Sequence, residues 1–210
     1  MLDYKKIHLL GYSGHAYVVI DVALSNNLKV QSYFDKFQAK ANPYCLAYSG
    51  SETEVDIKSI IKSDFIFPAV GSNSIRTKLV TFIEGHNLNQ TTLMAHSALI
   101  STMATVGLST LIGPKVIVNS MARIGKGCII NSGAIIEHEC KIGNFSHIAP
   151  GAVLAGNVEI GKNCLIGANT VIKEGIVIAD DVVIGAGAVV LKNITEKGTW
   201  VGNPAKLLLK

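Results

Sequence analysis

The sequence is poor in aromatic residues and in charge. Aromatic side chains make up 6% and charged ones 16% of the 210 residues, whereas 49% are hydrophobic. The apolar content is therefore mostly Ile, Val, Ala and Leu, and with 20 glycines it is typical of many short strands joined by tight turns. The basic residues are scattered and the net charge is only +4, which argues against a nucleic-acid-binding surface but allows small anionic ligands.

Long apolar runs and paired cysteines are also absent. No apolar segment approaches the length of a membrane span, because charged residues interrupt every long one. The apolar run from Ile7 to Leu10 is too short for a signal-peptide core. Cys45, Cys128, Cys140 and Cys164 form no C-x-x-C pair, so neither a zinc site nor a disulfide framework is indicated. We therefore expect a cytoplasmic protein with reduced thiols, no metal and no membrane or nucleic-acid partner.

The segment 1–92 alternates strand-like and helix-like stretches. Strands are expected over 7–10, 30–34 and 65–70, and helices over 16–26 and 74–84. This alternation predicts a small parallel α/β unit of the Rossmann-like kind.

A period of six replaces this alternation in the segment 93–210. Aliphatic residues occupy every sixth position from Ile112 to Val190, Ile100 and Val106 extend the series upstream, and a small or modest side chain such as Cys128 follows four residues later. Neither a helix nor a flat strand has this period. A triangular solenoid of about five coils does, with residues 18 apart stacked. The alternative, a β-sandwich, would show turns of varying length.

Several motifs resemble those of one enzyme family. The repeats 124–129 (IGKGCI) and 160–165 (IGKNCL) resemble the hexapeptide repeats of left-handed β-helix acyltransferases, and the ending 202–206 (GNPAK) is similar to the segment that closes such helices. The turn 11–15 (GYSGH) and the stretch 136–147 (IEHECKIGNFSH) more specifically resemble the sugar-nucleotide N-acetyltransferases of the bacillosamine and perosamine pathways. Sialic acid O-acetyltransferases are near relatives.

This resemblance implies a left-handed parallel β-helix, acetyl-CoA as co-substrate, and a homotrimer whose active sites lie in clefts between neighbouring helices. The left hand comes from the resemblance, since crossover connections are otherwise almost always right-handed. The nearest likeness implies N-acetylation of a UDP-linked 4-amino-4,6-dideoxy sugar. GDP-perosamine and sialic acid are the alternative acceptors.

His138 and Glu139 are the candidate catalytic residues. Amide formation from a thioester needs a base for the amine proton, and His138 lies two places after the inward Ile136, at or near a corner. From the register alone, His138 could equally be an exposed turn histidine with an unrelated acidic neighbour. The resemblance implies that His138 is the general base and Glu139 its support. Cys140 shares the small inward position, where cysteine behaves as a buried hydrophobe, so we expect direct transfer without an acyl-enzyme.

The resemblance also implies which residues bind the two substrates. Acetyl-CoA would contact His147, Gly156, Ala168 and Ala186, although glycine and alanine are common at corners. A strand-to-helix turn can point N–H groups at an anion, and an acid about twenty residues later can meet a ribose. The nucleotide would therefore contact Ser13, Gly14, His15, Asp35, Lys36 and Gly71, which are otherwise ordinary turn residues. Lys36 stands where the family often has an acid.

Two other classes share the solenoid. Zinc-dependent carbonic anhydrases of the γ type need three imidazoles around the metal, and the sequence offers only His138 and His147 in suitable places. A non-catalytic trimer that binds a nucleotide is the other alternative. A metal assay on the purified protein tests the first alternative, and thiol release from acetyl-CoA in the presence of candidate sugars tests the second.

Overall fold

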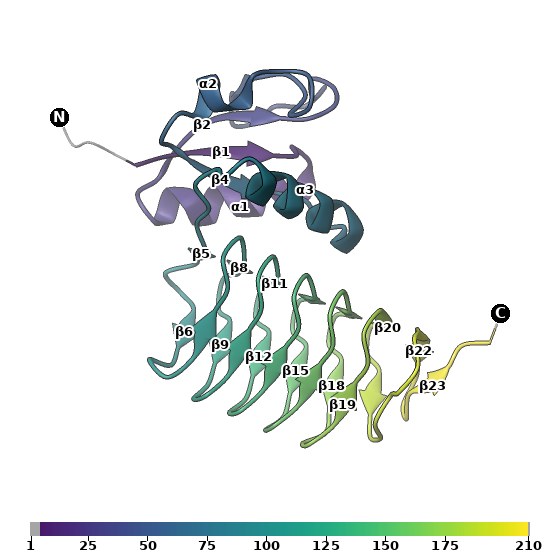
Figure 1. Cartoon of the computed structure of the whole chain (residues 1–210). Helices are drawn as coiled ribbons and strands as arrows, with labels where there is room; N and C mark the ends of the chain where they lie inside the picture. The colour runs from purple at the N-terminus through teal and green to yellow at the C-terminus, as the bar shows by residue number, and fades with distance from the viewer. Residues whose placement is uncertain (1–4, 210) are drawn as a thin grey trace.

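The computed structural model describes residues 5–209, which form an α/β unit followed by a β-helix (Figure 1). The α/β unit consists of β1 (Lys6–Leu10), α1 (Gly14–Ser25), β2 (Lys29–Phe34), β3 (Ala47–Tyr48), α2 (Ile57–Ile61), β4 (Phe65–Pro68) and α3 (Asn73–Gly85). Its strands pair in parallel in the order β3-β2-β1-β4, so the expected parallel α/β unit is confirmed. The expected third strand, 65–70, ends two residues earlier, at Pro68.

Alternate residues of β1 face opposite sides of this sheet. Ile7 and Leu9 pack with α1 in one cluster, whereas Leu10 packs with α2 and α3 in another. This alternation follows from the two-residue period of a strand. Helices therefore cover both faces, as in other parallel sheets.

The β-helix has three parallel sheets, one along each side of a triangular prism. The five-stranded sheet contains β7 (Thr105–Val106), β10 (Arg123–Ile124), β13 (Lys141–Ile142), β16 (Glu159–Ile160) and β19 (Val177–Ile178). The six-stranded sheet contains β6 (Leu99–Ile100), β9 (Ile117–Val118), β12 (Ile135–Ile136), β15 (Val153–Leu154), β18 (Val171–Ile172) and β21 (Val189–Val190). The eight-stranded sheet contains β5 (Leu93–Met94), β8 (Leu111–Ile112), β11 (Ile129–Ile130), β14 (His147–Ile148), β17 (Leu165–Ile166), β20 (Val182–Ile184), β22 (Gly198–Val201) and the antiparallel β23 (Lys206–Leu207).

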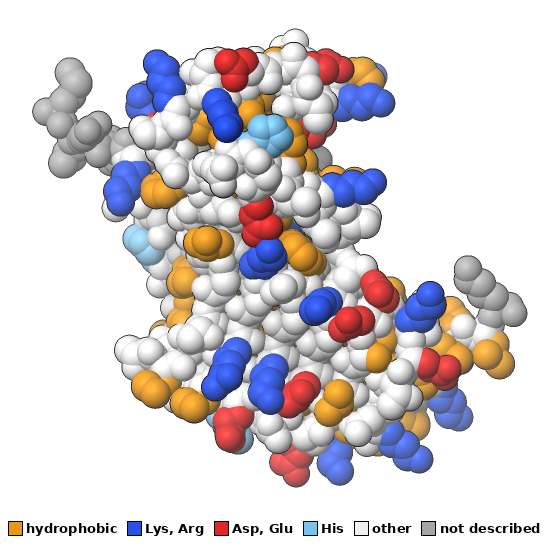
Figure 2. All heavy atoms as spheres, in the orientation of Figure 1, with side chains coloured by type: hydrophobic (Ala, Val, Ile, Leu, Met, Phe, Trp, Pro, Cys, Tyr) orange, Lys and Arg blue, Asp and Glu red, His pale blue; other side chains and the backbone are white. Residues whose placement is uncertain are grey.

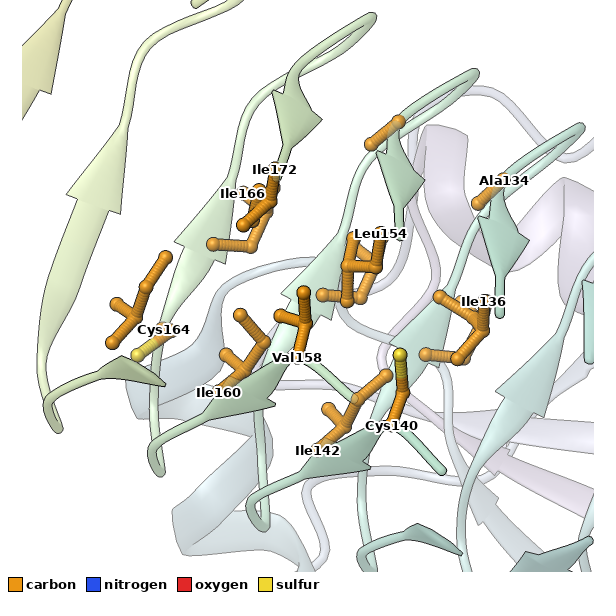
Figure 3. Packing of buried hydrophobic residues seen from close by; sticks show 14 of the residues in the cluster. Ala134, Ile136, Cys140, Ile142, Leu154, Val158, Ile160, Cys164, Ile166 and Ile172 are labelled. Atoms are coloured by element: carbon orange, nitrogen blue, oxygen red, sulfur yellow. The ribbon is translucent and has the colours of Figure 1, made fainter. Parts of the chain in front are cut away.

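The aliphatic repeat fills the interior of the prism. Ile136 pairs with Leu154, and Leu154 with Ile172, so residues 18 apart stack as the period of six predicts. Figure 3 shows these side chains pointing inward together with Cys140 and Cys164. Both cysteines are buried and free, in agreement with their expected place as small inward residues.

The three outer faces of the prism differ in chemistry. On the six-stranded sheet every outward residue is aliphatic, namely Leu99, Ile117, Ile135, Val153, Val171 and Val189. On the five-stranded sheet the outward row is mixed, and Lys141 Nζ pairs with Glu159 Oε1 at 2.6 Å. Figure 2 likewise shows basic and acidic side chains interspersed on the face in view. We call the outer surface of the six-stranded sheet the aliphatic face.

The α/β unit covers the beginning of the eight-stranded sheet. The outward residues Leu93, Leu111 and Ile129 are buried in one cluster with α1. This contact is apolar and extends over successive coils, so the two parts of the chain are joined by a cluster that is separate from the interior of the prism. Within residues 5–209, no helix has both the length and the apolar character needed to cross a membrane.

Candidate active site

His138 and Glu139 occupy the corner between β12 and β13. His138 Nδ1 lies 3.1 Å from Glu139 Oε2, and Glu139 takes a positive φ of 63° at this corner. With Nδ1–H donated to the carboxylate, Nε2 is left free to accept a proton. The side chains are 60% and 62% exposed in the single chain, so water weakens their attraction. The expected base and its acidic support are therefore adjacent, at an edge of the aliphatic face.

Gly156 lies directly beside the His138 ring, one coil later. A Cβ built on Gly156 would come within 2.6 Å of His138 Cε1 and Nε2, a distance that real Cβ contacts do not allow. The backbone N–H of Asn157 also donates to the carbonyl of His138 at 2.8 Å. Any larger residue at Gly156 would thus displace the imidazole. The sequence indicated only acetyl-CoA binding for Gly156; the 18-residue spacing places it one coil after His138, but the contact depends on the direction of the ring.

Cys140 lies next to the pair in sequence but points into the prism. It is 0% exposed, and its Sγ donates to the carbonyl of Ala155 at 3.1 Å. Burial raises the pKa of the Cys140 thiol, so the thiolate needed for nucleophilic attack is disfavoured. The geometry supports the expectation that Cys140 forms no acyl-enzyme.

His147 lies on β14 at the junction between the two parts of the chain, on a different side of the prism from His138. Asn131 Nδ2 donates to its Nε2 at 3.2 Å. Burial, aided by the nearby charge of Arg76 and by His15, lowers the pKa of His147 to about 4. The ring is therefore neutral at pH 7, and it lies beside the backbone of Gly71.

The remaining candidates for acetyl-CoA binding lie at another edge of the prism. Ala168 and Ala186 are in the corners that follow β17 and β20, where the eight-stranded sheet meets the six-stranded sheet. Gly156 and His138 instead lie where the six-stranded sheet meets the five-stranded sheet. Both edges border the aliphatic face, but they are its two opposite edges.

A pocket of about 400 Å³ opens at the carboxyl ends of β1 and β2, and it contains three of the six candidates for nucleotide binding, Ser13, Asp35 and Lys36. The Asp35 carboxylate accepts the backbone N–H of Tyr12 at 3.0 Å and that of Lys36 at 2.7 Å. Asp35 thus holds the pocket's two loops together, a role that no sequence motif indicates. Glu52 also lines the pocket and was missed.

Gly14, His15 and Gly71 do not line this pocket. Gly14 and His15 begin α1, so the expected turn 11–15 is shorter than predicted. His15 lies against Gly71: a Cβ built on Gly71 would be 3.9 Å from the Cβ of His15. The Nε2 atom of His15 is buried and has no hydrogen-bond partner among residues 5–209. Burial, with a smaller effect of Arg76, lowers the pKa of His15 to about 4. His15, Gly71 and His147 therefore meet at the junction, deeper than the pocket.

Metal ligation has no candidate group in the described part of the chain. No three His, Cys, Asp or Glu side chains among residues 5–209 lie close enough together to hold an ion.

Comparisons with known proteins agree with this architecture. Residues 6–83 match the family model described as the PglD N-terminal domain, and residues 121–156 and 157–192 each match the model for the bacterial transferase hexapeptide (six repeats). None of the curated proteins matched the sequence.

Solved structures cover nearly the whole chain. PerB from Caulobacter crescentus, in complex with CoA and GDP-perosamine, is 27% identical over 97% of this chain and 97% of its own, with a TM-score of 0.91. The acetyltransferase domain of PglB from Neisseria gonorrhoeae, in complex with acetyl coenzyme A, is 27% identical over 98% and 100%, with a TM-score of 0.87. WeeI from Acinetobacter baumannii, at 22% identity and a TM-score of 0.81, shares the fold. The expected left-handed parallel β-helix is confirmed by this likeness.

Proposed function

We propose that this chain, which belongs to the left-handed β-helix family of hexapeptide-repeat acyltransferases, transfers the acetyl group of acetyl-CoA to the 4-amino group of a UDP-linked 4-amino-4,6-dideoxy sugar. The observation that carries the proposal is the His138–Glu139 pair, whose imidazole lies against Gly156 at an edge of the aliphatic face. The complexes of the similar PerB and PglB domains with CoA, a nucleotide sugar or acetyl-CoA support it. The boundary at residues 92 and 93 then separates acceptor binding from donor binding.

His138 serves as the general base of a direct transfer. Its Nε2 takes a proton from the amine as the nitrogen attacks the thioester carbonyl carbon, and the C–S bond then breaks. The departing CoA sulfur leaves as a thiolate and takes up the proton from His138. Glu139 accepts the Nδ1–H and stabilises the imidazolium that forms in between.

The active site draws on two chains of a homotrimer. Gly156 lies at one edge of the aliphatic face and Ala168 and Ala186 at the opposite edge, so a cleft that contains all three needs a neighbouring chain. Leu99 and Val171 on that face are 69% and 44% exposed in the single chain. Packing three aliphatic faces around a threefold axis would bury them and would bring the His138 edge of one chain against the Ala168–Ala186 edge of the next.

Closure by a neighbouring chain also explains how an exposed pair could work as a base. In the single chain His138 and Glu139 are both more than half exposed, and the interaction of such a pair is weak in water. A neighbour that excludes water would lower the local dielectric and strengthen the contact. Formation of the trimer would thus be required for His138 to act as an efficient base.

The acceptor enters from the α/β unit. The pocket beside Ser13 lies at the start of α1, where no acidic residue occupies the first turn, so the free N–H groups and the helix dipole favour a phosphate. His15 and Gly71 continue from this turn toward His147. A nucleotide held here would direct its sugar toward the β-helix, whereas a free monosaccharide would leave the pocket unused.

The test compares three acceptors at equal concentration with acetyl-CoA: a UDP-4-amino-4,6-dideoxy sugar, GDP-perosamine and sialic acid. Thiol release and the mass of the product report the reaction, and the matched control is His138→Ala, which keeps the fold but lacks the base. We expect the wild-type protein to acetylate the UDP sugar at nitrogen, with little release from the variant.

Preference for GDP-perosamine would replace UDP with GDP in the proposed acceptor and leave N-acetylation as the reaction. Transfer to a hydroxyl of sialic acid would replace N-acetylation with O-acetylation. Thiol release with none of the acceptors would reject the proposed function.

A further inference from the structure

Arg76, in α3, is a fully buried arginine whose contacts are all to neutral oxygens. It is 1% exposed. Nε donates to Gly127 O at 2.6 Å, Nη2 to Phe145 O at 2.8 Å and Asn73 Oδ1 at 2.7 Å, and Nη1 to Gly71 O at 2.9 Å and Val70 O at 3.3 Å. None of these acceptors is a carboxylate, so its charge is dispersed over carbonyl and amide dipoles.

These contacts join the α/β unit to the β-helix at successive coils. Gly127 and Phe145 are 18 residues apart and occupy equivalent corners of neighbouring coils. Asn73, which accepts from Arg76, donates through Nδ2 to Cys164 O of the next coil at 2.9 Å. The beginning of α3 is therefore hydrogen-bonded to three coils in a row.

Adhesion between the two parts of the chain does not need this arginine. Leu93, Leu111 and Ile129 already supply an apolar contact with α1. A buried guanidinium loses its hydration, and only hydrogen bonds to well-oriented acceptors compensate for that free-energy cost. A planar fork of five N–H donors does, however, fix direction and distance, which apolar packing does not. Arg76 thus specifies how the two parts are aligned.

The segment that Arg76 aligns contains Gly71, which is one of the candidates for substrate binding. Gly71, whose carbonyl accepts from Arg76, lies against His15 and beside His147. We propose that Arg76 is a positioning residue for acetyl transfer and that it holds the loop at Val70 and Gly71, of which Val70 lines the pocket beside Ser13, in register with the coils of the β-helix. This inference rests on the proposed function, and Arg76 itself is buried away from the reacting atoms.

The experiment measures steady-state kinetics of Arg76→Lys in the full chain, with the acceptor that the wild-type protein uses. Lysine keeps the charge but cannot bond to both coils and to the loop. A displacement near 1 Å at a reacting centre can cost about 10²-fold, so we expect kcat to fall about 10- to 100-fold at a temperature where the variant is folded. Because the coils are intact, the KM for acetyl-CoA should change less than about threefold.

The matched control is Lys126→Ala. Lys126 Nζ pairs with Glu84 Oε1 at 2.7 Å, so it also joins α3 to the β-helix, but at the exposed end of the helix away from Gly71. It should leave kcat unchanged. As a second readout, guanidinium ion at millimolar concentration should partly restore kcat in Arg76→Ala by occupying the emptied site. Asn73→Ala, which removes one acceptor and the Cys164 contact, gives a milder variant should Arg76→Ala fail to fold.

Wild-type kcat in both folded Arg76→Lys and Asn73→Ala would overturn the positioning role while leaving the proposed function intact. A lowered melting temperature with unchanged kcat would do the same, because it would assign Arg76 to stability alone. An inactive wild-type protein would contradict the proposed function itself.

Discussion

At the scale of single residues, the corner at His138 carries the chemistry. Its imidazole contacts a carboxylate on one side and lies against Gly156 on the other. The register of six predicted that His138 would stand at a corner, and the neighbouring Glu139 could be read from the sequence. The need for glycine at 156 could not, because it depends on the direction in which the ring points across one coil.

His138→Ala should reduce turnover about 10²- to 10⁴-fold, the usual contribution of a positioned base. Glu139→Gln should cost less, since it keeps a hydrogen-bond acceptor but loses the charge that stabilises the imidazolium. Acetyl-CoA affinity, measured by calorimetry, should change little in either variant. Near-normal turnover in His138→Ala would mean that another group takes the amine proton.

Cys140→Ala should remain active. The thiol is buried, its pKa is raised by that burial, and its Sγ donates to a backbone carbonyl in the interior. Loss of one small buried side chain costs about 1 kcal/mol of stability, visible as a small drop in the melting temperature. An acetyl group on Cys140, detected by mass spectrometry during turnover, would instead establish an acyl-enzyme.

At the scale of elements, the repeat made the β-helix predictable. A period of six determines strand, corner and stacking together, and the observed pairs Ile136–Leu154 and Leu154–Ile172 follow from it. The α/β unit was predicted in outline, but β3 and α2 were not, because they are only two and five residues long and so show too little of any apolar period. The aliphatic face could be recognised only after the sheets were assigned.

Val171→Lys should weaken the trimer. Val171 lies on the aliphatic face and is 44% exposed in the single chain, so a trimer built on that face would bury the new charge without a partner. Val177→Lys is the matched control, because Val177 is 43% exposed but lies on the mixed five-stranded sheet. Sedimentation should show dissociation for the first variant only. An intact trimer in Val171→Lys would place the interface elsewhere.

At the scale of the whole molecule, the docking of the α/β unit on the β-helix could not be predicted from the sequence. The repeat positions His147 within the coils, and the turn signals position His15 and Gly71 within the α/β unit. Nothing in either pattern says where one part meets the other. Arg76, which joins them, is a single arginine in an ordinary helix and gave no signal of its burial.

The junction should make stability depend on pH. The pKa values of His15 and His147 are lowered to about 4 in the folded chain, below the unfolded value of 6.5. The unfolded chain therefore binds more protons between these values, so the free energy of unfolding should fall as the pH drops from 6.5 toward 4. Urea titrations at several pH values between 6.5 and 4 measure this free energy of unfolding. The double variant His15→Asn, His147→Asn should lose less stability, and an identical slope would contradict this cause.

The central claim, that each active site is completed by two chains, is tested by mixing two inactive variants. His138→Ala disables one edge of the aliphatic face, and Ala186→Trp, at an exposed corner, blocks the opposite edge. In randomly mixed trimers about one site in four would combine an intact His138 edge from one chain with an intact Ala186 edge from the next. Co-refolding should thus restore about a quarter of wild-type turnover, whereas no restoration would show that each chain works alone.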